Sequence, residues 1–419
     1  MSRYTEHALH NDHHEPQRIA IPLLTSESQK HPAGQSVGHR FAVRISLFYA
    51  STFGIIGVHL PFFPVWLKAI GVDVSWIGFI TAAPSLSRFT VLPFVTATAE
   101  HRQILRGTMI GLAFATAVGF TVLGLLRDPL TILIVYAVVA CLWTPLSPLT
   151  DGYALKGVTR FGLDYGQMRL WGSTSFVVFA LIAGLLFQII EPQNLIWIIV
   201  AMAFLSAVVG LGIVPLDAPA TGPAHQGRAT GMLRQPLFLA ILGASALIQG
   251  SHAAYYAFAS ITWQNAGFGG FAIAVLWSIG VVAEIVVFAI SPRFTLSPQV
   301  MVMIGAASGV LRWVITAQEP SIEVLAVVQL MHGLTFGITQ VGTVALIVRS
   351  VPHNFIASAQ GYMVATQGAT TSLTMICSGL IYARVGEGVY YAMAMMALAG
   401  GLVMALARRR LDMHHAVMD

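Results

Sequence analysis

Long apolar runs are the feature that most constrains what this chain can fold into. Between residues 42 and 406, runs of about 17 to 27 residues follow one another, each long enough to cross ~30 Å of hydrocarbon as a helix. Only 9% of the residues are charged and 56% are hydrophobic, so the chain lacks the polar surface that a soluble domain needs. We therefore predict an all-α membrane protein.

The runs predict twelve transmembrane helices, approximately residues 42–67, 76–96, 108–126, 130–150, 170–190, 195–214, 237–259, 270–290, 300–316, 322–348, 357–382 and 389–406. A polar stretch separates six runs from six, which is typical of two pseudo-symmetric six-helix bundles with a site between them. The expected parts are a disordered tail (1–40), a first bundle (41–214), a linker (215–236), a second bundle (237–407) and a second tail (408–419).

The net charge of +5 is interpreted as membrane topology. If both termini are cytoplasmic, nearly all Lys and Arg residues outside the helices fall on the cytoplasmic side, and Lys68, Arg127 and Arg384 fall on the other. We expect a multi-pass protein of the cell inner (plasma) membrane, acting as a monomer. The basic residues are scattered over short loops, so no nucleic-acid partner is expected.

The N-terminal tail and the cysteines predict no metal centre or cofactor. The tail is rich in histidine and lacks the apolar core of a signal peptide, which favours a solvated segment over a metal-binding one. Cys141 and Cys377 both fall inside apolar runs, where small buried hydrophobic residues are the simplest interpretation.

Five ionisable residues fall near the middle of the predicted helices. Counting ~1.5 Å per residue places them about 15 to 22 Å deep. An ionised group there costs at least ~2.5 to 3.5 kcal/mol on insertion scales, so several together imply partners or a hydrated space. The five are Arg88, His252, Glu284, Arg312 and His332.

Glu284, Arg312 and His332, on successive helices, are predicted to form a proton-coupling site. Burial and a neighbouring cation shift the pKa of a carboxyl group in opposite directions, so a change of environment could load and release a proton. The alternative is an inert ion pair between Glu284 and Arg312 that fixes helix packing. Function is the better explanation, because a buried pair rarely recovers its own desolvation free energy.

Arg88 stands alone in the first half, in the stretch PSLSRFTVLP, with no acidic residue at its depth. A guanidinium can grip an anionic substrate through two parallel hydrogen bonds. Substrate binding is therefore the favoured role. A role in proton transfer or gating, or a pair with another polar group, are the alternatives.

Further candidates for substrate binding are aromatic and amide side chains. In the seventh run, residues three and four apart share a face that could stack a ring-shaped ligand or simply pack between helices. The amides could line the site or join helices. These candidates are His252, Tyr255, Tyr256, Trp263, Tyr49, Gln340 and Gln367.

Asp151, Asp164 and Arg169 are predicted to form a cytoplasmic gate, closed by charge pairing in the outward-facing state. Arg169 begins the fifth helix in the stretch DYGQMRLWGS, across a short loop from Asp151. Simple anchoring of that helix end by a cytoplasmic positive charge is the alternative.

The chain resembles the major facilitator superfamily, and more narrowly the phenylpropionate permease group related to lactose permease-type proton symporters. The matching stretches extend over about residues 42–406. They are LPFFPVWLKAIG (60–71), Arg88, SPLTD (147–151), DYGQMRLWGS (164–173), SHAAYYAFASITWQNAG (251–267), LWSIGVVAEIVVFAIS (276–291), LRW (311–313) and HGLTF (332–336).

The resemblance implies alternating access and proton-coupled import. In lactose permease-like carriers a glutamate in helix eight, an arginine in helix nine, and a histidine with a nearby glutamate in helix ten serve substrate binding and proton coupling. Glu284, Arg312 and His332 are similar to the first three. Thr335 and Phe336 stand where the fourth would be, which leaves Glu284 as the carboxylate at midplane.

The expected function is a proton-coupled symporter that imports a small organic solute, with an aromatic carboxylate such as phenylpropionate favoured. Its partners would be the substrate, protons and the lipid bilayer. The alternatives within transport are a sugar or nucleoside symporter and a drug/proton antiporter; a channel or a sensor is a minority alternative. An enzyme is not expected, because no HExxH, GxSxG or P-loop pattern is present.

Overall fold

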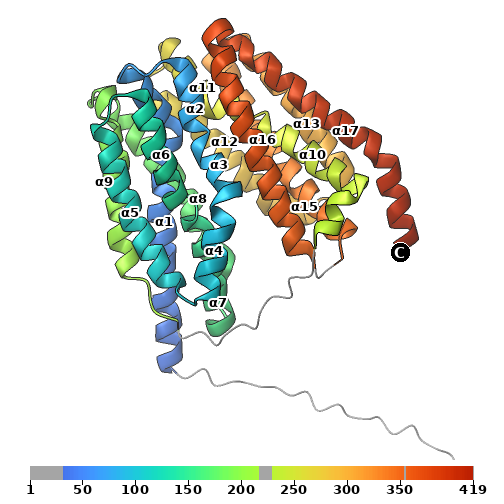
Figure 1. The fold of residues 1–419 in the computed structure, drawn as a ribbon, viewed down its shortest axis with the longest axis horizontal. Coiled ribbons are helices and arrows are strands. Elements are labelled where there is room, and N and C mark those ends of the chain that lie inside the picture. The colour runs from blue at the N-terminus through green and yellow to red at the C-terminus, as the bar shows by residue number, and fades with distance from the viewer. Residues whose placement is uncertain (1–31, 217–228, 353–354, 419) are drawn as a thin grey trace, which may run out of the picture.

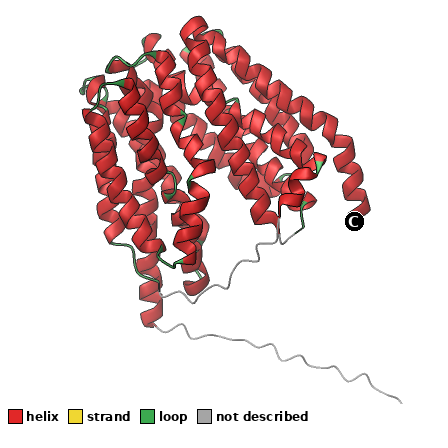
Figure 2. Ribbon diagram, viewed as in Figure 1, coloured by secondary structure: helices red, strands yellow, loops and turns green. Residues whose placement is uncertain are grey.

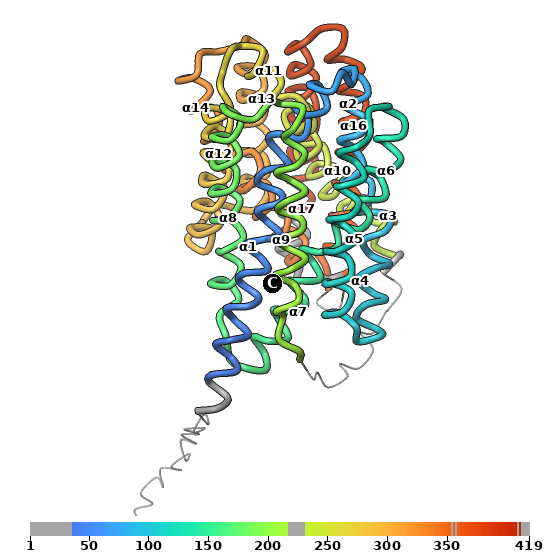
Figure 3. The backbone as a smooth tube through the Cα atoms, turned by 90° about the vertical axis from the view of Figure 1, so that its left-hand side faces the viewer, coloured from blue at the N-terminus to red at the C-terminus, as the bar shows by residue number. Residues whose placement is uncertain are grey.

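The computed structural model describes residues 32–216, 229–352 and 355–418. Within these ranges the chain is helical and contains no strand, as Figure 2 shows. Seen from the side in Figure 3, the long helices run roughly along one direction, as membrane spans do. The predicted all-α architecture is confirmed.

The helices form two groups that stand side by side in Figure 1. The first half contains α1 (Pro32–Ala69), α2 (Val74–Thr81), α3 (Ala83–Thr90), α4 (Leu92–His101), α5 (Leu105–Leu125), α6 (Pro129–Trp143), α7 (Leu146–Phe161), α8 (Tyr165–Leu186) and α9 (Ile196–Leu211). The second half contains α10 (Pro236–Gly250), α11 (Ala253–Asn265), α12 (Gly270–Ile290), α13 (Pro298–Thr316), α14 (Ile322–Leu330), the π-helix η4 (Gly333–Ile338), α15 (Thr339–Ser350), α16 (Ile356–Val385) and α17 (Val389–Met418).

The number of spans agrees with the predicted twelve. Ten described helical segments are long and apolar enough to cross a membrane, or eleven when the bent pair 74–90 and 92–101 is included. One of these segments, Ser358–Arg408, contains both α16 and α17, which are separated by the short turn Gly386–Gly388. Counting these two helices separately brings the eleven described segments to twelve spans.

The two end helices extend further than expected. Helix α1 begins at Pro32, so residues 32–40 are helical and do not belong to a disordered tail. Helix α17 continues to Met418 through the segment predicted to be the second tail, because this segment contains no proline or glycine that would end a helix. Residues 1–31, and residues 217–228 of the predicted linker, lie outside the described residues.

Several spans are interrupted in the middle. The second span is divided at Ala82 and Val91, each followed by a proline at the start of the next helix, which removes a backbone donor and ends the preceding helix. The seventh span breaks at Ser251 and His252, and the tenth contains the π-helix η4. Interrupted helices are characteristic of transporter binding sites, because irregular backbone at membrane depth is tolerated where it borders a site.

The two halves are in close contact at one face. We call this the far face; it contains the α1–α2 turn, whereas α1 begins at the opposite, terminal face (Figure 1). The far-face seam consists of two pairs of glycines, Gly78 with Gly379 and Gly184 with Gly270. A Cβ added to Gly78 would lie 2.8 Å from the Gly379 Cα, and one on Gly184 would lie 2.6 Å from the Gly270 carbonyl oxygen.

Toward the terminal face the halves diverge (Figure 1). The extensive helix contacts across the halves join α8 with α12, α2 and α3 with α16, and α1 with α11. Among the described helices, α4 has extensive contacts only with α3 and α5 of its own half. The structure is therefore a conformation closed at the far face and more open at the terminal face.

Replacing Gly184 by leucine is expected to hold the far face apart. The new side chain has no room, because Gly270 backbone already fills the position of its Cβ. The distance between spin labels at Lys68 and Asn265, whose side chains hydrogen-bond across the halves at this face, would increase. The measurement is double electron–electron resonance with Cys141 and Cys377 replaced by serine.

The matched control for this experiment is Gly243→Leu. Gly243 also lies inside a helix, but nothing lies within 4 Å of an added Cβ. An unchanged label distance in Gly184→Leu, or the same change in both variants, would contradict the role of the seam.

Candidate substrate and proton site

Arg312 is the centre of a buried polar network in the second half. Its side chain is fully buried, and the two terminal nitrogens donate hydrogen bonds to His332 Nδ1 (2.9 Å), Thr335 Oγ1 (3.1 Å) and Gln329 Oε1 (3.0 Å). Nε of Arg312 is buried without a hydrogen-bond partner among the described residues. A buried cation surrounded by neutral acceptors is costly unless it is well bonded, so this network fixes the guanidinium in place.

Aromatic rings cover the faces of this guanidinium. The Arg312 Cζ lies 4.7 Å from the centre of the Tyr255 ring and 4.6 Å from that of Trp313, distances at which a cation is attracted to a ring. The Tyr255 hydroxyl donates to Gln329 Oε1 at 2.9 Å. Gln329 therefore accepts from both Arg312 and Tyr255 and ties α11, α13 and α14 together.

Glu284 points toward His332 and does not pair with Arg312. Its Oε2 lies 3.7 Å from His332 Nε2, and a quarter of the side chain is exposed. No ion pair between Glu284 and Arg312 occurs among the described residues, so the alternative of an inert pair of these two is not what the structure shows. The His332 imidazole ring therefore lies between the Arg312 guanidinium and the Glu284 carboxylate.

The π-helix η4 brings Glu284 and His332 together. An added Cβ on Gly333 would lie 2.7 Å from the Ala283 carbonyl oxygen, and one on Gly337 would lie 3.0 Å from Val287. Glycines at these positions let η4 pack directly on the turn of α12 that carries Glu284. Single π-helical turns are frequent at functional sites.

Most of the predicted aromatic face is packed inside the second half. His252, Tyr255 and Trp263 are 2% exposed or less, so in this conformation a substrate cannot touch them. Tyr256 differs, because its side chain is only partly buried and its ring stacks on His252 with centroids 5.9 Å apart.

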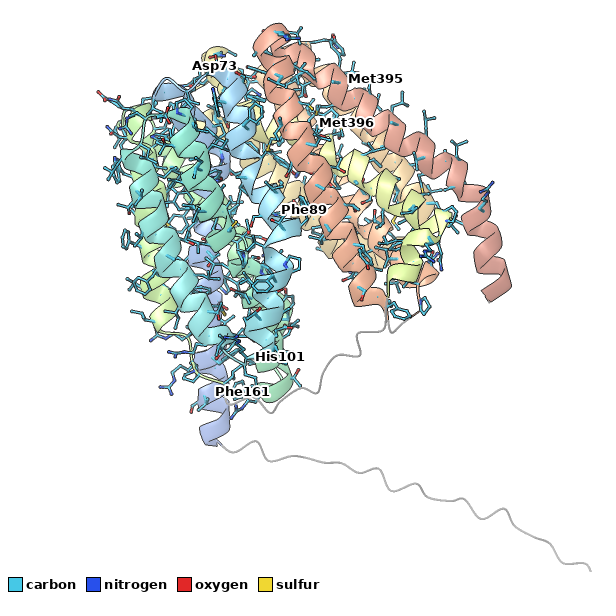
Figure 4. The ribbon with its side chains drawn as sticks, viewed as in Figure 1. Asp73, Phe89, His101, Phe161, Met395 and Met396 are labelled. Atoms are coloured by element: carbon cyan, nitrogen blue, oxygen red, sulfur yellow. The ribbon has the colours of Figure 1, made fainter. Side chains whose placement is uncertain are left out.

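Arg88 lies where the two halves meet. Its Cβ is 3.6 Å from the position of an added Cβ on Gly368 of α16, and the side chain is exposed. The neighbouring Phe89 lies between Asp73 at the far face and His101 at the terminal face in Figure 4, which places Arg88 at mid-depth. The Tyr256 hydroxyl lies within range of the charges of Arg88 and Glu284.

Three glutamine side chains form a separate amide cluster in the second half. Gln367 Nε2 donates to Ser245 Oγ at 2.9 Å and to Gln340 Oε1 at 3.4 Å, and Gln249 Nε2 lies 3.5 Å from the same oxygen. Oε1 of Gln249 is buried without a partner among the described residues. Gln340 and Gln367 are thus joined to each other, and both are partly exposed.

The predicted gate residue Asp151 is held by two hydrogen bonds and an ion pair. The hydroxyls of Tyr49 and Tyr165 donate to Oδ1 at 2.6 and 3.0 Å, and Arg169 Nε lies 3.8 Å from the same atom. The Arg169 guanidinium also lies 4.1 Å from the centre of the Phe53 ring. Tyr49, predicted to bind substrate, belongs to this cluster and is fully buried.

Two of the three predicted gate residues, Asp151 and Arg169, lie together. Asp151 on α7 and Arg169 on α8 belong to the same half, so their pair cannot bridge the two halves, and it is formed here with the far face closed. Asp164 instead caps α8, accepting a hydrogen bond from the Gln167 backbone at 3.2 Å. Across the halves, Arg169 interacts electrostatically with Glu284.

Replacing Asp151 by asparagine is expected to lower thermal stability. The amide keeps one acceptor oxygen but loses the charge that attracts Arg169, and the two tyrosine hydroxyls must share what is left. A loss of about 1 to 3 kcal/mol is expected for disturbing such a partly buried network. The readout is the unfolding midpoint of the purified protein in detergent; Asp164→Asn is the control and should stay near wild type, because asparagine caps helices as well as aspartate does. Equal midpoints for both variants would show that the Asp151 network does not stabilise the fold.

Sequence reasoning missed the neutral partners of the buried cation. Gln329 is the clearest case, because it lies three residues before His332, on the same face of the tenth span, and this spacing could have indicated it. The Asp151 cluster also contains Tyr165, which was not predicted.

The family of the chain follows from comparison with known proteins. The MFS_1 like family model matches residues 42–393, and the chain belongs to this family. It is a multi-pass membrane transporter of the major facilitator type, and not an enzyme.

Individual relatives share most of the chain's length. The "Probable 3-phenylpropionic acid transporter" of Escherichia coli (strain K12) is 31% identical, over 84% of this chain and 94% of that protein. The maltose permease of Geobacillus stearothermophilus is 24% identical, over 87% and 94%. Among solved structures, a mutant of the nucleoside transporter NupG has a TM-score of 0.78 at 16% identity, covering 88% of this chain and 99% of that one.

Proposed function

We propose that this transporter carries a small aromatic carboxylate together with a proton. The observation that carries the proposal is the position of Arg88, an exposed guanidinium at mid-depth where the halves meet, in electrostatic range of the partly exposed Tyr256 ring. A cation beside an aromatic surface suits a ligand that has a carboxylate and a ring. The relative that is 31% identical bears the name of a phenylpropionic acid transporter, which supports this substrate class.

The proton would be carried by Glu284. Among the described residues it is the acidic side chain that pairs with the buried cation network of the second half, 3.7 Å from His332 Nε2, and it is partly exposed within range of the Arg169 charge. Opening to one face and then to the other would change the surroundings of the carboxylate, which is how one group can bind a proton at one face and release it at the other. Arg312 and His332 would hold the carboxylate and set its charge environment.

We also propose the topology and assembly of the carrier. The scarcity of Lys and Arg at the far face supports cytoplasmic termini, and hence an inner-membrane protein in which the conformation described here is open to the cytoplasm. The two halves, residues 41–214 and 237–407, would rock against each other within a monomer, with import as the direction of transport.

A second candidate is a proton symporter for a nucleoside or sugar. The amide cluster of Gln249, Gln340 and Gln367 favours it, since amides suit hydroxyl-bearing solutes and Oε1 of Gln249 has no partner among the described residues. The structural neighbours include a D-xylose-proton symporter, with a TM-score of 0.66 at 11% identity; this similarity concerns the fold alone.

Counterflow in proteoliposomes separates these candidates. Vesicles loaded with 3-phenylpropionate, a nucleoside or a disaccharide would be offered the labelled form of each solute. Counterflow of the aromatic acid alone, together with alkalinisation of the outside when unloaded vesicles take up the acid, supports the main proposal. Counterflow of a nucleoside or sugar without the acid would replace it by the second candidate.

A further inference from the structure

The hydrogen bonds of the buried network determine which nitrogen of His332 carries a proton. A guanidinium has five N–H donors and no acceptor, and it stays protonated in proteins. Because Arg312 Nη1 lies 2.9 Å from His332 Nδ1, that ring nitrogen must accept and carries no hydrogen. The ring hydrogen is then on Nε2, the atom that lies 3.7 Å from Glu284 Oε2.

The same argument gives the opposite tautomer for His252. Its Nδ1 lies 3.2 Å from the carbonyl oxygens of Ile248 and Gln249, which can only accept, so Nδ1 carries the hydrogen. Its Nε2 lies 3.0 Å from Thr335 Oγ1. That hydroxyl oxygen already accepts from Arg312, and its own hydrogen has two acceptors in reach, His252 Nε2 at 3.0 Å and the His332 carbonyl oxygen at 3.4 Å, of which Nε2 is the closer.

A second proton on either ring would face the buried cation. On His332 it would have to occupy Nδ1, directly against the guanidinium. On His252 it would occupy Nε2, against a hydroxyl already oriented by that guanidinium. Two cations in contact in a buried region repel strongly. The titratable or charged groups around the two rings are Arg312 on α13, Glu284 on α12, Tyr255 and Tyr256 on α11 and, acting on Glu284 from α8, Arg169.

We propose that His332 and His252 are permanently neutral, with the proton on Nε2 of His332 and on Nδ1 of His252, and that the transported proton resides on Glu284 alone. His332 is then a positioning residue: it directs an N–H toward the Glu284 carboxylate and relays the influence of Arg312 to it. The role of Glu284 rests on the proposed proton symport, whereas the two tautomers do not depend on transport.

The direct test is ¹⁵N solid-state NMR of the full-length protein in lipid bilayers, with labelled histidine rings. Signals of His332 and His252 are assigned by their loss in His332→Gln and His252→Asn. We expect an unprotonated Nδ1 and protonated Nε2 for His332, and the reverse for His252. Neither ring should change between about pH 5 and pH 8. An imidazolium spectrum for His332 within this range, or the same tautomer for both rings, would overturn the proposal.

The functional test uses a side chain that cannot bind a proton. Glutamine at position 332 can accept from Arg312 through its oxygen and donate to Glu284 through its nitrogen. His332→Gln should therefore keep pH-driven uptake within about threefold of wild type. His332→Leu, which makes neither bond, should lose most of it, and His101→Gln serves as the control.

The outcomes distinguish this proposal from the proposed function. Loss of coupling in His332→Gln, with normal counterflow, would make the imidazole the proton carrier and overturn the proposal. If the wild-type protein shows no pH-driven uptake of any solute, the proposed symport fails, while the tautomers are still decided by the spectra.

Discussion

Replacing Glu284 by glutamine is expected to abolish accumulation of substrate against its gradient, while exchange of substrate across the membrane continues. The amide has nearly the same size and keeps an oxygen on the side of His332 Nε2, which lies 3.7 Å from the Glu284 carboxylate, but it cannot take up or release a proton. With an imposed pH gradient in proteoliposomes, the inside-to-outside substrate ratio should therefore settle at about 1, because an uncoupled carrier only equilibrates its substrate. Counterflow without a gradient should stay close to wild type.

The control for this variant is Glu323→Gln. Glu323 is an exposed glutamate in the first turn of α14, so its loss should leave both assays unchanged. Uphill accumulation by Glu284→Gln equal to that of wild type would remove Glu284 from the proton pathway. Loss of counterflow as well would instead indicate that Glu284 binds the substrate.

Replacing Arg88 by lysine should impair transport of carboxylates and spare their neutral analogues. Lysine keeps the charge but lacks the planar pair of donors that grips both oxygens of a carboxylate. The apparent KM for 3-phenylpropionate is expected to rise about 10- to 100-fold. Inhibition by the corresponding amide, 3-phenylpropionamide, should change little.

Comparing the acid with its amide separates loss of carboxylate binding from loss of helix packing in Arg88→Lys. Arg349→Lys is the control, because Arg349, like Arg88, is an exposed arginine near the end of a helix, but it lies on α15 of the second half, away from the contact of α3 with α16. Should acid and amide weaken in parallel in Arg88→Lys, the guanidinium would be supporting the packing of α3 and not binding the carboxylate.

The fold was predictable because the bilayer imposes it. Apolar runs of sufficient length must be helices at membrane depth, so hydropathy alone gave the number of spans and the division into two halves. The interruptions were harder to see. Pro84 and Pro93 flank Arg88 and divide the second span, but Pro61 and Pro64 lie inside the continuous helix α1, so a proline alone does not tell whether a span will break.

The site was predictable only as far as charge and depth allow. Counting residues from the helix starts placed Glu284, Arg312 and His332 at similar depth, and the structure brings them together. Which of them touch depends on helix rotation and on the π-helix η4, and neither follows from apolar patterning. The same holds for Tyr49: its depth in the first helix was compatible with substrate binding, but its side chain points to Asp151 and hydrogen-bonds to it.

If the network around Arg312 and His332 binds and releases one proton, on Glu284, the energetics of the transport cycle follow. If Glu284 alone is loaded and the cargo is a monoanion, the loaded carrier moves no net charge, so the voltage across the bilayer neither drives nor opposes this step. The stored work would come entirely from the acidity difference between the compartments, which sets a ceiling of about tenfold enrichment for each unit of pH. Such a carrier would accumulate aromatic acids best when the outside is more acidic than the cytoplasm, and would not accumulate them when the two pH values are equal.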